Sequence, residues 1–215
     1  MRHPEILLCR AATVLVAAAV ALAACSSAPP IRLHTLMPIE PPERAASLDG
    51  APPFAIVLEP IRIPVQVDQA QWLVRLPDGS VAVLEQERWV SPLRDEIRQA
   101  LLESLVVRYA AVEARAASRG AAPPWRVAVD ILRFDSAPGR EARIEGAWTI
   151  SGAGADSRVT RCEWLVRESA ADGMPALAAA HRRALERLGA GIGESLRRLA
   201  RGEPAGACPA REASP

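Results

Sequence analysis

Hydrophobic and polar residues alternate along several short stretches of the chain, which is the pattern of half-buried β-strands. The segments predicted as strands are 31–36, 54–58, 71–76, 80–85, 125–134, 143–151 and 158–167. Pro77, Asp78 and Gly79 separate the third from the fourth and predict the turn of a hairpin. Pro60 and Pro64 follow the second segment and are expected at bends or edges, because proline has no backbone N–H to donate.

Two longer stretches repeat their apolar residues every three or four positions, as amphipathic helices do. The first is predicted to begin with Ser91 as N-cap and Pro92 as its first residue, and to run to about Ala117. The second is predicted from near Pro175 to Gly202. The helical stripes comprise Leu93, Ile97, Leu101, Leu105 and Val112 in the first, and Leu177, His181, Leu185, Leu188, Ile192, Leu196 and Leu199 in the second.

The order of these elements predicts an α+β fold in a single domain, with four strands, a helix, three strands and a second helix. One mixed or mostly antiparallel sheet with both long amphipathic helices packed on one face would bury both stripes. The glycine-rich run 189–195 lies within the second helical pattern and lacks the Lys of a phosphate-binding loop. It is therefore expected to let this helix pack closely against the sheet or a neighbour.

Residues 1–24 have the composition of a lipoprotein signal peptide. Basic residues precede an apolar run over 11–24, which at about 14 residues is shorter than the roughly 20 that cross a bilayer. Leu22 to Cys25 then form a lipobox, where small residues flank the cleavage site and the Cys25 thiol accepts a diacylglyceryl group. An ordinary secretory signal with an incidental Cys is the alternative. We expect lipid on Cys25 to anchor the mature chain.

These patterns divide the chain into four regions. Residues 1–24 are the expected signal peptide, and 25–53 are the lipidated Cys and a Pro-rich tether that contains a short edge strand. Residues 54–202 are the predicted folded domain, and 203–215 are a flexible tail. Ser26 follows the lipidated Cys, where an Asp is the usual signal for retention in the inner membrane. We therefore expect the protein in the outer membrane, facing the periplasm.

The charge balance argues against a protein that binds nucleic acid. The chain carries 26 basic residues, all of them Arg, and 25 acidic residues, and loss of residues 1–24 removes two Arg and one Glu. The mature chain is thus close to neutral, whereas nucleic-acid binding requires a strongly basic surface. Because net neutrality gives no electrostatic attraction to anionic lipid, the acyl chains must provide the anchor.

Cys162 and Cys208 remain as thiols after cleavage and acylation. In an oxidising compartment they are predicted to form a disulfide that pins the tail to a strand, and the alternative is two unrelated thiols. The sequence has no C-x-x-C or H-x-x-x-H spacing, so no metal site is expected.

Residues for catalysis are nearly absent from the sequence. The mature chain has two His residues, His34 in the first strand segment and His181 on the second helical stripe. A single His on an apolar stripe is more often a packed residue than a general base. Glu85, Glu87 and Arg88 are expected to form an exposed charged patch. We therefore expect a protein that is not an enzyme and has no cofactor other than the lipid.

Three segments resemble the ABC-type transport auxiliary lipoprotein family, the PqiC-like lipoproteins. They are the lipobox followed closely by strand segment 31–36, the proline-containing stretch 61–75, and E-R-W-V-S-P-L at 87–93, which is similar to the family's R-W-x-x-P-L at the start of a helix. The likeness covers nearly the whole mature chain. It departs at Asp68 and Gln69, where the family more often has Asp and Arg, and at His34, where an aromatic environment is usual.

The resemblance implies a non-enzymatic subunit of an intermembrane lipid-transport system that supports outer-membrane integrity. Family members are tethered to the outer membrane and dock on an MCE-type partner anchored in the inner membrane. By this resemblance Arg88 and Trp89 would contact the partner. The alternative is that Trp89 is a core residue at the start of the helix and Arg88 pairs with an acidic neighbour. A symmetric partner would also allow a homo-oligomeric ring of this domain.

Two other functions remain open from the sequence. One is an envelope adaptor for an ABC exporter that does not contact lipid, and the other is a periplasmic ligand-binding module. An apolar cavity between the helices and the sheet would favour ligand binding. A solid core with an exposed apolar patch would favour docking.

Overall fold

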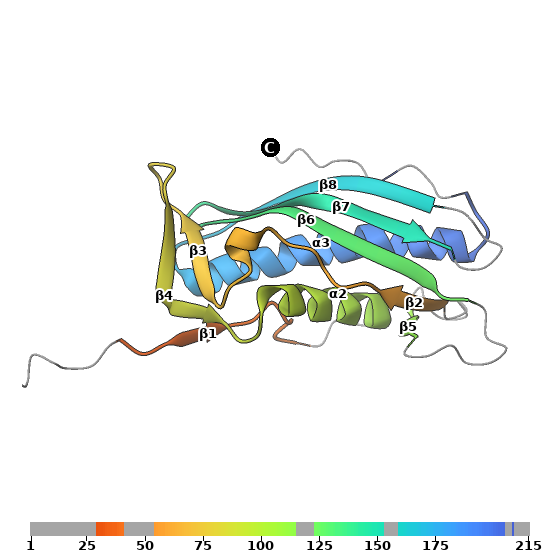
Figure 1. Ribbon diagram of the computed structural model, residues 1–215, viewed down its shortest axis with the longest axis horizontal. Helices are drawn as coiled ribbons and strands as arrows, with labels where there is room; N and C mark the ends of the chain where they lie inside the picture. The colour runs from red at the N-terminus through yellow and green to blue at the C-terminus, as the bar shows by residue number, and fades with distance from the viewer. Residues whose placement is uncertain (1–28, 41–53, 115–122, 153–158, 205–207, 209–215) are drawn as a thin grey trace, which may run out of the picture. The chain divides into compact units, whose positions relative to one another are not determined.

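The structure is a computed structural model that describes residues 29–40, 54–114, 123–152, 159–204 and 208 (Figure 1). The predicted signal peptide, the predicted lipidation site at Cys25 and most of the predicted tail lie outside these residues. The elements are β1 (Arg32–His34), β2 (Phe54–Leu58), the 3-10 helix η2 (Val65–Val67), β3 (Gln71–Arg75), β4 (Val81–Trp89), α2 (Leu93–Tyr109), β5 (Ala111–Glu113), β6 (Trp125–Ala137), β7 (Glu141–Ser151), β8 (Val159–Ser169) and α3 (Met174–Ala200).

The strands form two sheets, so the α+β class is as predicted but the single predicted sheet is wrong. The five-stranded sheet has the order β5-β2-β6-β7-β8, and the three-stranded sheet has the order β1-β4-β3. Strand β2 pairs in parallel with both β5 and β6, and β1 pairs in parallel with β4. The pairs β3–β4, β6–β7 and β7–β8 are antiparallel.

Prolines after β2 explain why a second sheet begins. The chain beyond β2 still runs beside β6, where Glu59 N donates to Val127 O at 2.9 Å. Beyond Pro60 the pairing resumes at Arg62, whose N donates to Val129 O at 3.2 Å, and Pro64 then has no N–H with which to continue it. The chain therefore turns through η2 and leaves β6, and β3 and β4 pair with each other and with β1 instead.

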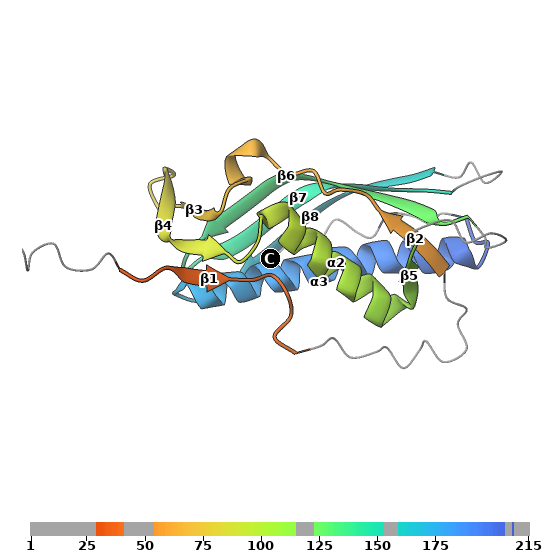
Figure 2. The same cartoon turned by 60° about the horizontal axis from the view of Figure 1, so that its bottom comes forward.

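Both helices lie on the same side of the five-stranded sheet, as predicted (Figures 1 and 2). Helix α3 packs on β6, β7 and β8, while α2 packs on α3 and β5. Most of the predicted stripe residues are buried in this layer and none of the following is more than 3% exposed: Leu93, Ile97, Leu101, Leu105, His181, Leu177, Leu185, Leu188, Ile192, Leu196 and Leu199. The helical periodicity therefore identified the core of this layer.

Helix α2 ends at Tyr109, so its predicted extension to about Ala117 is wrong. Ala110 adopts the left-handed conformation (φ 54°) and its N–H bonds to Leu105 O, which closes the helix. The chain then forms β5, where Val112 is 54% exposed. Val112 matched the helical spacing because a strand of three residues is too short to reveal its own alternation.

Two glycines let α3 approach α2 closely, which confirms the packing expected for residues 189–195. A Cβ on Gly189 would lie 2.8 Å from Ser104 Oγ, and one on Gly193 would lie 2.4 Å from the Tyr109 ring. Side chains at these two positions would therefore force the helices apart.

Candidate functional site

The segment that follows the predicted lipid anchor is fastened to the domain. β1 pairs with the end of β4, so that His34 lies opposite Trp89. Val90 N donates to His34 O at 2.9 Å. Leu36, two residues further on, is 1% exposed and belongs to the main hydrophobic core. Residues 32–36 are therefore held by the same core as the two sheets.

A buried carboxylate near the start of α2 holds this segment in place. Glu96 is 2% exposed, and its Oε2 accepts hydrogen bonds from Thr35 Oγ1 (2.6 Å) and Leu36 N (2.8 Å). Its Oε1 accepts a bond from Ser91 Oγ (2.6 Å). Because Ser91 bonds to Glu96, it does not cap the helix as predicted, and Pro92 is the N-cap. A buried carboxylate needs such donors, so these bonds specify one position for the segment.

Two more charged residues bind the same segment. Glu87 of β4 is 8% exposed and lies 2.6 Å from His34 Nε2 and 3.3 Å from Arg32. From α3, Arg182 Nη1 donates to Thr35 O at 3.1 Å, and burial lowers the pKa of Arg182. The prediction that Glu87 belongs to an exposed charged patch is therefore wrong. No short motif marks Glu96 or Arg182 in the sequence, because their partners lie far along the chain.

Four ring side chains join the two sheets, and we call them the junction cluster: Trp72 of β3, Trp89 of β4, Phe134 of β6 and His181 of α3. The Trp72 and Trp89 centroids are 4.1 Å apart, and Trp89 meets Phe134 edge-on at 6.1 Å. Phe134 and His181 stack with centroids 4.1 Å apart and planes inclined by 5°. Aromatic contacts of this kind stabilise beyond the area they bury, so the cluster fixes one sheet against the other.

His181 is fully buried in the junction cluster, and burial lowers its pKa to about 3. Its Nε2 lies 2.8 Å from Ser136 Oγ, which also accepts a hydrogen bond from Trp72 Nε1 at 2.8 Å. The imidazole is therefore neutral near pH 7 and lacks access to solvent, so it does not serve as a general base. The expectation that His181 is a packed residue is confirmed.

The structure places the two predicted docking residues on opposite faces of β4. Trp89 is 4% exposed and lies in the junction cluster, in agreement with the alternative that it is a core residue. Arg88 is partly exposed on the outer face, where its Nε donates to Glu85 O at 3.1 Å. Arg88 is therefore the one of the two whose side chain can reach a partner without a change in the core.

An open groove of about 580 Å³ lies between the residues before β3 and the start of α2. It is lined by Asp68, Gln69, Ala70, Trp89, Val90, Ser91, Pro92, Arg94 and Asp95. Val90 is 59% exposed there, and Arg94 Nε donates to Asp68 Oδ1 at 3.1 Å. An open groove with an exposed aliphatic side chain and charges of both signs suits a segment of another protein better than a small molecule.

A second cavity lies between residues 36–38 and the two helices and measures about 20 Å³. It is lined by Leu36, Pro38, Ala100, Ser104, Arg108, Arg182, Leu185 and Glu186. A space of this size holds about one water molecule. It does not supply the apolar ligand site that a binding module would need.

Cys162 and Cys208 are joined by a disulfide in the structure, with their Cα atoms 5.4 Å apart. Cys162 lies in β8, is 1% exposed and pairs with Trp148 of β7. Since β8 is an edge strand of the five-stranded sheet, the bond holds residue 208 next to that edge. Counting of thiols on the purified protein is the experimental test of this pairing.

Metal-binding and membrane-spanning features are absent from the described part of the chain. No three His, Cys, Asp or Glu side chains within it are grouped so that they could hold a metal ion. None of the helices in those residues has both the length and the hydropathy to cross a membrane.

Solved structures share this fold. The crystal structure of an uncharacterised protein superposes with a TM-score of 0.62 at 14% sequence identity, over 78% of this chain and 99% of its own. The crystal structure of protein XCC0632 from Xanthomonas campestris, assigned to the family model DUF330, superposes with a TM-score of 0.58 at 17% identity, over 82% of this chain and 96% of its own. No curated protein matches the sequence significantly.

A family model described as the ABC-type transport auxiliary lipoprotein component matches residues 34–193. The matched span begins at His34, the last residue of β1, and ends at Gly193 in α3, so it includes strands β2 to β8, α2 and most of α3. The chain therefore belongs to the ABC-type transport auxiliary lipoprotein family.

Proposed function

We propose that this protein is a lipid-anchored subunit of an intermembrane lipid-transport system, which docks on an MCE-type partner anchored in the inner membrane. The observation that carries the proposal is the family match over residues 34–193. In this proposal the acylated Cys25 holds the protein in the outer membrane with the domain in the periplasm. The domain would act through a docking surface and through its position at the membrane, and docking would support outer-membrane integrity.

The docking surface that the geometry favours is the open groove beside α2. Val90 is exposed in it, and Asp68 and Arg94 provide charges of both signs. Val90 also bonds to His34 in the segment that leads to the anchor, so docking and anchoring would occur on adjoining parts of the domain. A symmetric partner would bind several copies, and a ring of this domain around it belongs to the same proposal.

Photo-crosslinking in cells tests the proposal. A photoreactive amino acid at Val90 probes the groove, and one at Leu132, which is 65% exposed on β6, is the matched control. We expect Val90 to give an adduct with an MCE-domain protein and Leu132 to give none. An adduct with an exporter that has no MCE domain would favour the adaptor function instead. Equal adducts at both positions would contradict docking through the groove.

A further inference from the structure

The outer face of the three-stranded sheet carries aliphatic side chains that no other described segment covers. His34 faces inward with Trp89, so the adjacent Leu33 faces outward. Leu73 of β3 lies opposite Val83 of β4, and Val81 shares their face. Leu33, Val81 and Val83 are 61%, 54% and 47% exposed. Leu73 is partly buried and packs against the hydrophobic core, so we call the three exposed residues Leu33, Val81 and Val83 the outer patch.

The covalent path from the predicted lipid to the outer patch is short. Residues 26–31 separate Cys25 from β1. A fully extended chain spans at most about 3.6 Å per residue, so Arg32 lies within about 25 Å of the acylated Cys. That reach is less than the hydrocarbon thickness of a bilayer, which is about 30 Å. The Pro-rich stretch up to Pro53 follows β1 in the chain, so it adds nothing to this reach.

Residues 32–36 are bound to the domain, so the short chain from Cys25 also limits how far the three-stranded sheet can lie from the lipid anchor. Glu96 and Glu87 hold residues 32–36 to the domain, so β1 cannot move away from β4 without breaking buried hydrogen bonds and ion pairs. The chain that leads from the anchor therefore joins the domain at the three-stranded sheet. A face that is both apolar and held close to a bilayer has lipid as its nearest partner.

Cationic side chains border the outer patch. Arg88 lies opposite Leu33, and Arg75 lies on the same face of β3. Guanidinium groups bind phosphate in two-pronged geometry, while aliphatic side chains favour the boundary between headgroups and acyl chains. Glu85 shares this face and supplies one negative charge there, and Arg75 is already paired with Asp135 at 3.1 Å.

We propose that the outer patch rests on the surface of the bilayer to which Cys25 is anchored, with its aliphatic side chains at the headgroup boundary and Arg88 at a lipid phosphate. The inference rests on the lipid anchor of the proposed function. It goes beyond docking because contact at two points, the acyl chains and the patch, gives the domain a defined orientation on the membrane. The partner then meets one defined side of the domain.

The test uses the full lipidated protein in vesicles of phosphatidylethanolamine and phosphatidylglycerol. A photoreactive amino acid at Val83 probes the outer patch, and one at Leu132 is the matched control, since both positions lie on exposed strand faces. We expect lipid adducts to be several-fold more abundant at Val83 than at Leu132. With the probe at Val83, the substitution Arg88→Glu should lower the yield several-fold. Thermal unfolding of each variant verifies that the fold is intact.

Three outcomes would overturn the inference in different ways. Equal yields of lipid adducts at Val83 and Leu132 would show that the patch faces water, and would leave the docking proposal intact because the vesicles contain no partner. Adducts between two copies at Val83 would identify the patch as a self-association surface. A mature protein whose intact mass shows no acyl chains on Cys25 would contradict both this inference and the proposed anchor, while crosslinking at Val90 would still decide docking.

Discussion

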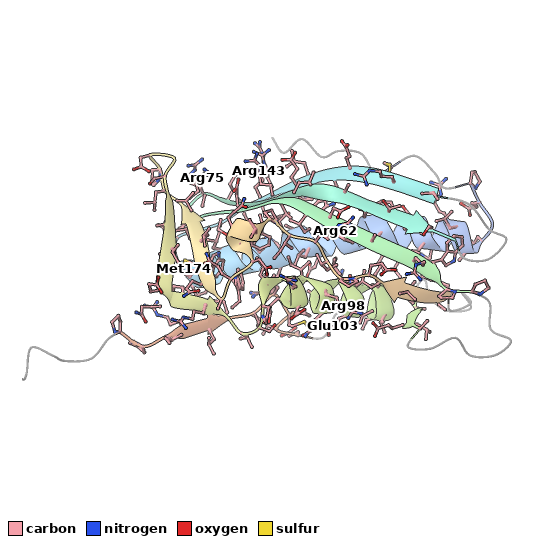
Figure 3. All side chains as sticks on the ribbon, in the orientation of Figure 1. Arg62, Arg75, Arg98, Glu103, Arg143 and Met174 are labelled. Atoms are coloured by element: carbon pink, nitrogen blue, oxygen red, sulfur yellow. A yellow bond between two sulfur atoms is a disulfide. The ribbon has the colours of Figure 1, made fainter. Side chains whose placement is uncertain are left out.

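The two sheets present opposite kinds of outer face. On the five-stranded sheet, Arg133 and Arg143 lie 3.4 and 3.0 Å from Glu145, and Arg62 pairs with Asp130 and lowers the pKa of that carboxyl. Figure 3 shows Arg143 on the side of the sheet that is turned away from α3. On the three-stranded sheet, the corresponding face carries the aliphatic outer patch. Ion pairs are thus more frequent on the first face, and exposed aliphatic side chains lie together on the second.

The two outer faces therefore differ in how well they suit contact with water. Exposed ion pairs contribute only about 0–1 kcal/mol each to stability. Charged side chains nevertheless keep a sheet surface solvated and discourage association with other strands. The outer patch, by contrast, gains free energy from contact with an apolar or amphipathic surface.

The largest expected effect comes from the inner face of the three-stranded sheet. Trp89→Ala removes the ring that links Trp72 to Phe134, and we expect it to lower the free energy of unfolding by about 3–5 kcal/mol. Arg88→Ala, on the outer face of the same strand, should change it by no more than about 0.5 kcal/mol. Urea unfolding of the mature protein measures both. Similar losses in the free energy of unfolding for the two variants would contradict the placement of Trp89 in the core and of Arg88 on the surface.

The next effect concerns the edge of the five-stranded sheet. Cys208→Ser opens the bond to Cys162, which spans 46 residues of sequence, and we expect a loss of about 2–4 kcal/mol in the free energy of unfolding. Reduction of the wild-type protein should produce the same loss, and reduction of the variant should produce none. Two free thiols in the oxidised wild-type protein, or a dimer that disappears on reduction, would contradict the intramolecular bond.

The smallest effect is a dependence on pH at the junction between the sheets. His181 has a pKa of about 3 when folded, well below its ordinary value of 6.5. Below pH 6.5 the imidazole of His181 binds a proton in the unfolded chain but not in the folded protein. The free energy of unfolding is therefore highest above pH 6.5 and declines toward about pH 3. At about 1.4 kcal/mol per pH unit, we expect a loss of about 2 kcal/mol between pH 6.5 and about pH 5.

Unfolding curves at several pH values measure this loss, and His181→Gln is the control. The variant should show a shallower decline over the same range, because Gln does not titrate. If the free energy of unfolding of His181→Gln declined with pH as steeply as that of the wild type, burial of His181 would not be the cause of the pH dependence.

Long regular patterns were predictable from the sequence, and short or distant pairings were not. Both helical stripes and the long strands β6, β7 and β8 were predicted because many residues repeat one period. The strand β5 was missed, because three residues carry too little periodicity. The role of Glu96 was also missed, because its bonds to Thr35 and Leu36 depend on contacts across about 60 residues of sequence.

The sequence alone determined the α+β class, the two amphipathic helices and the lipoprotein resemblance, since each is encoded by local spacing or by a contiguous motif. Only the tertiary structure decided that there are two sheets, that Trp89 lies in the core and Arg88 outside it, and that residues 32–36 are bound to the domain. The physical reason is that burial and charge pairing are set by which distant segments meet. That meeting follows from the packing of the whole chain, not from the period of any one part.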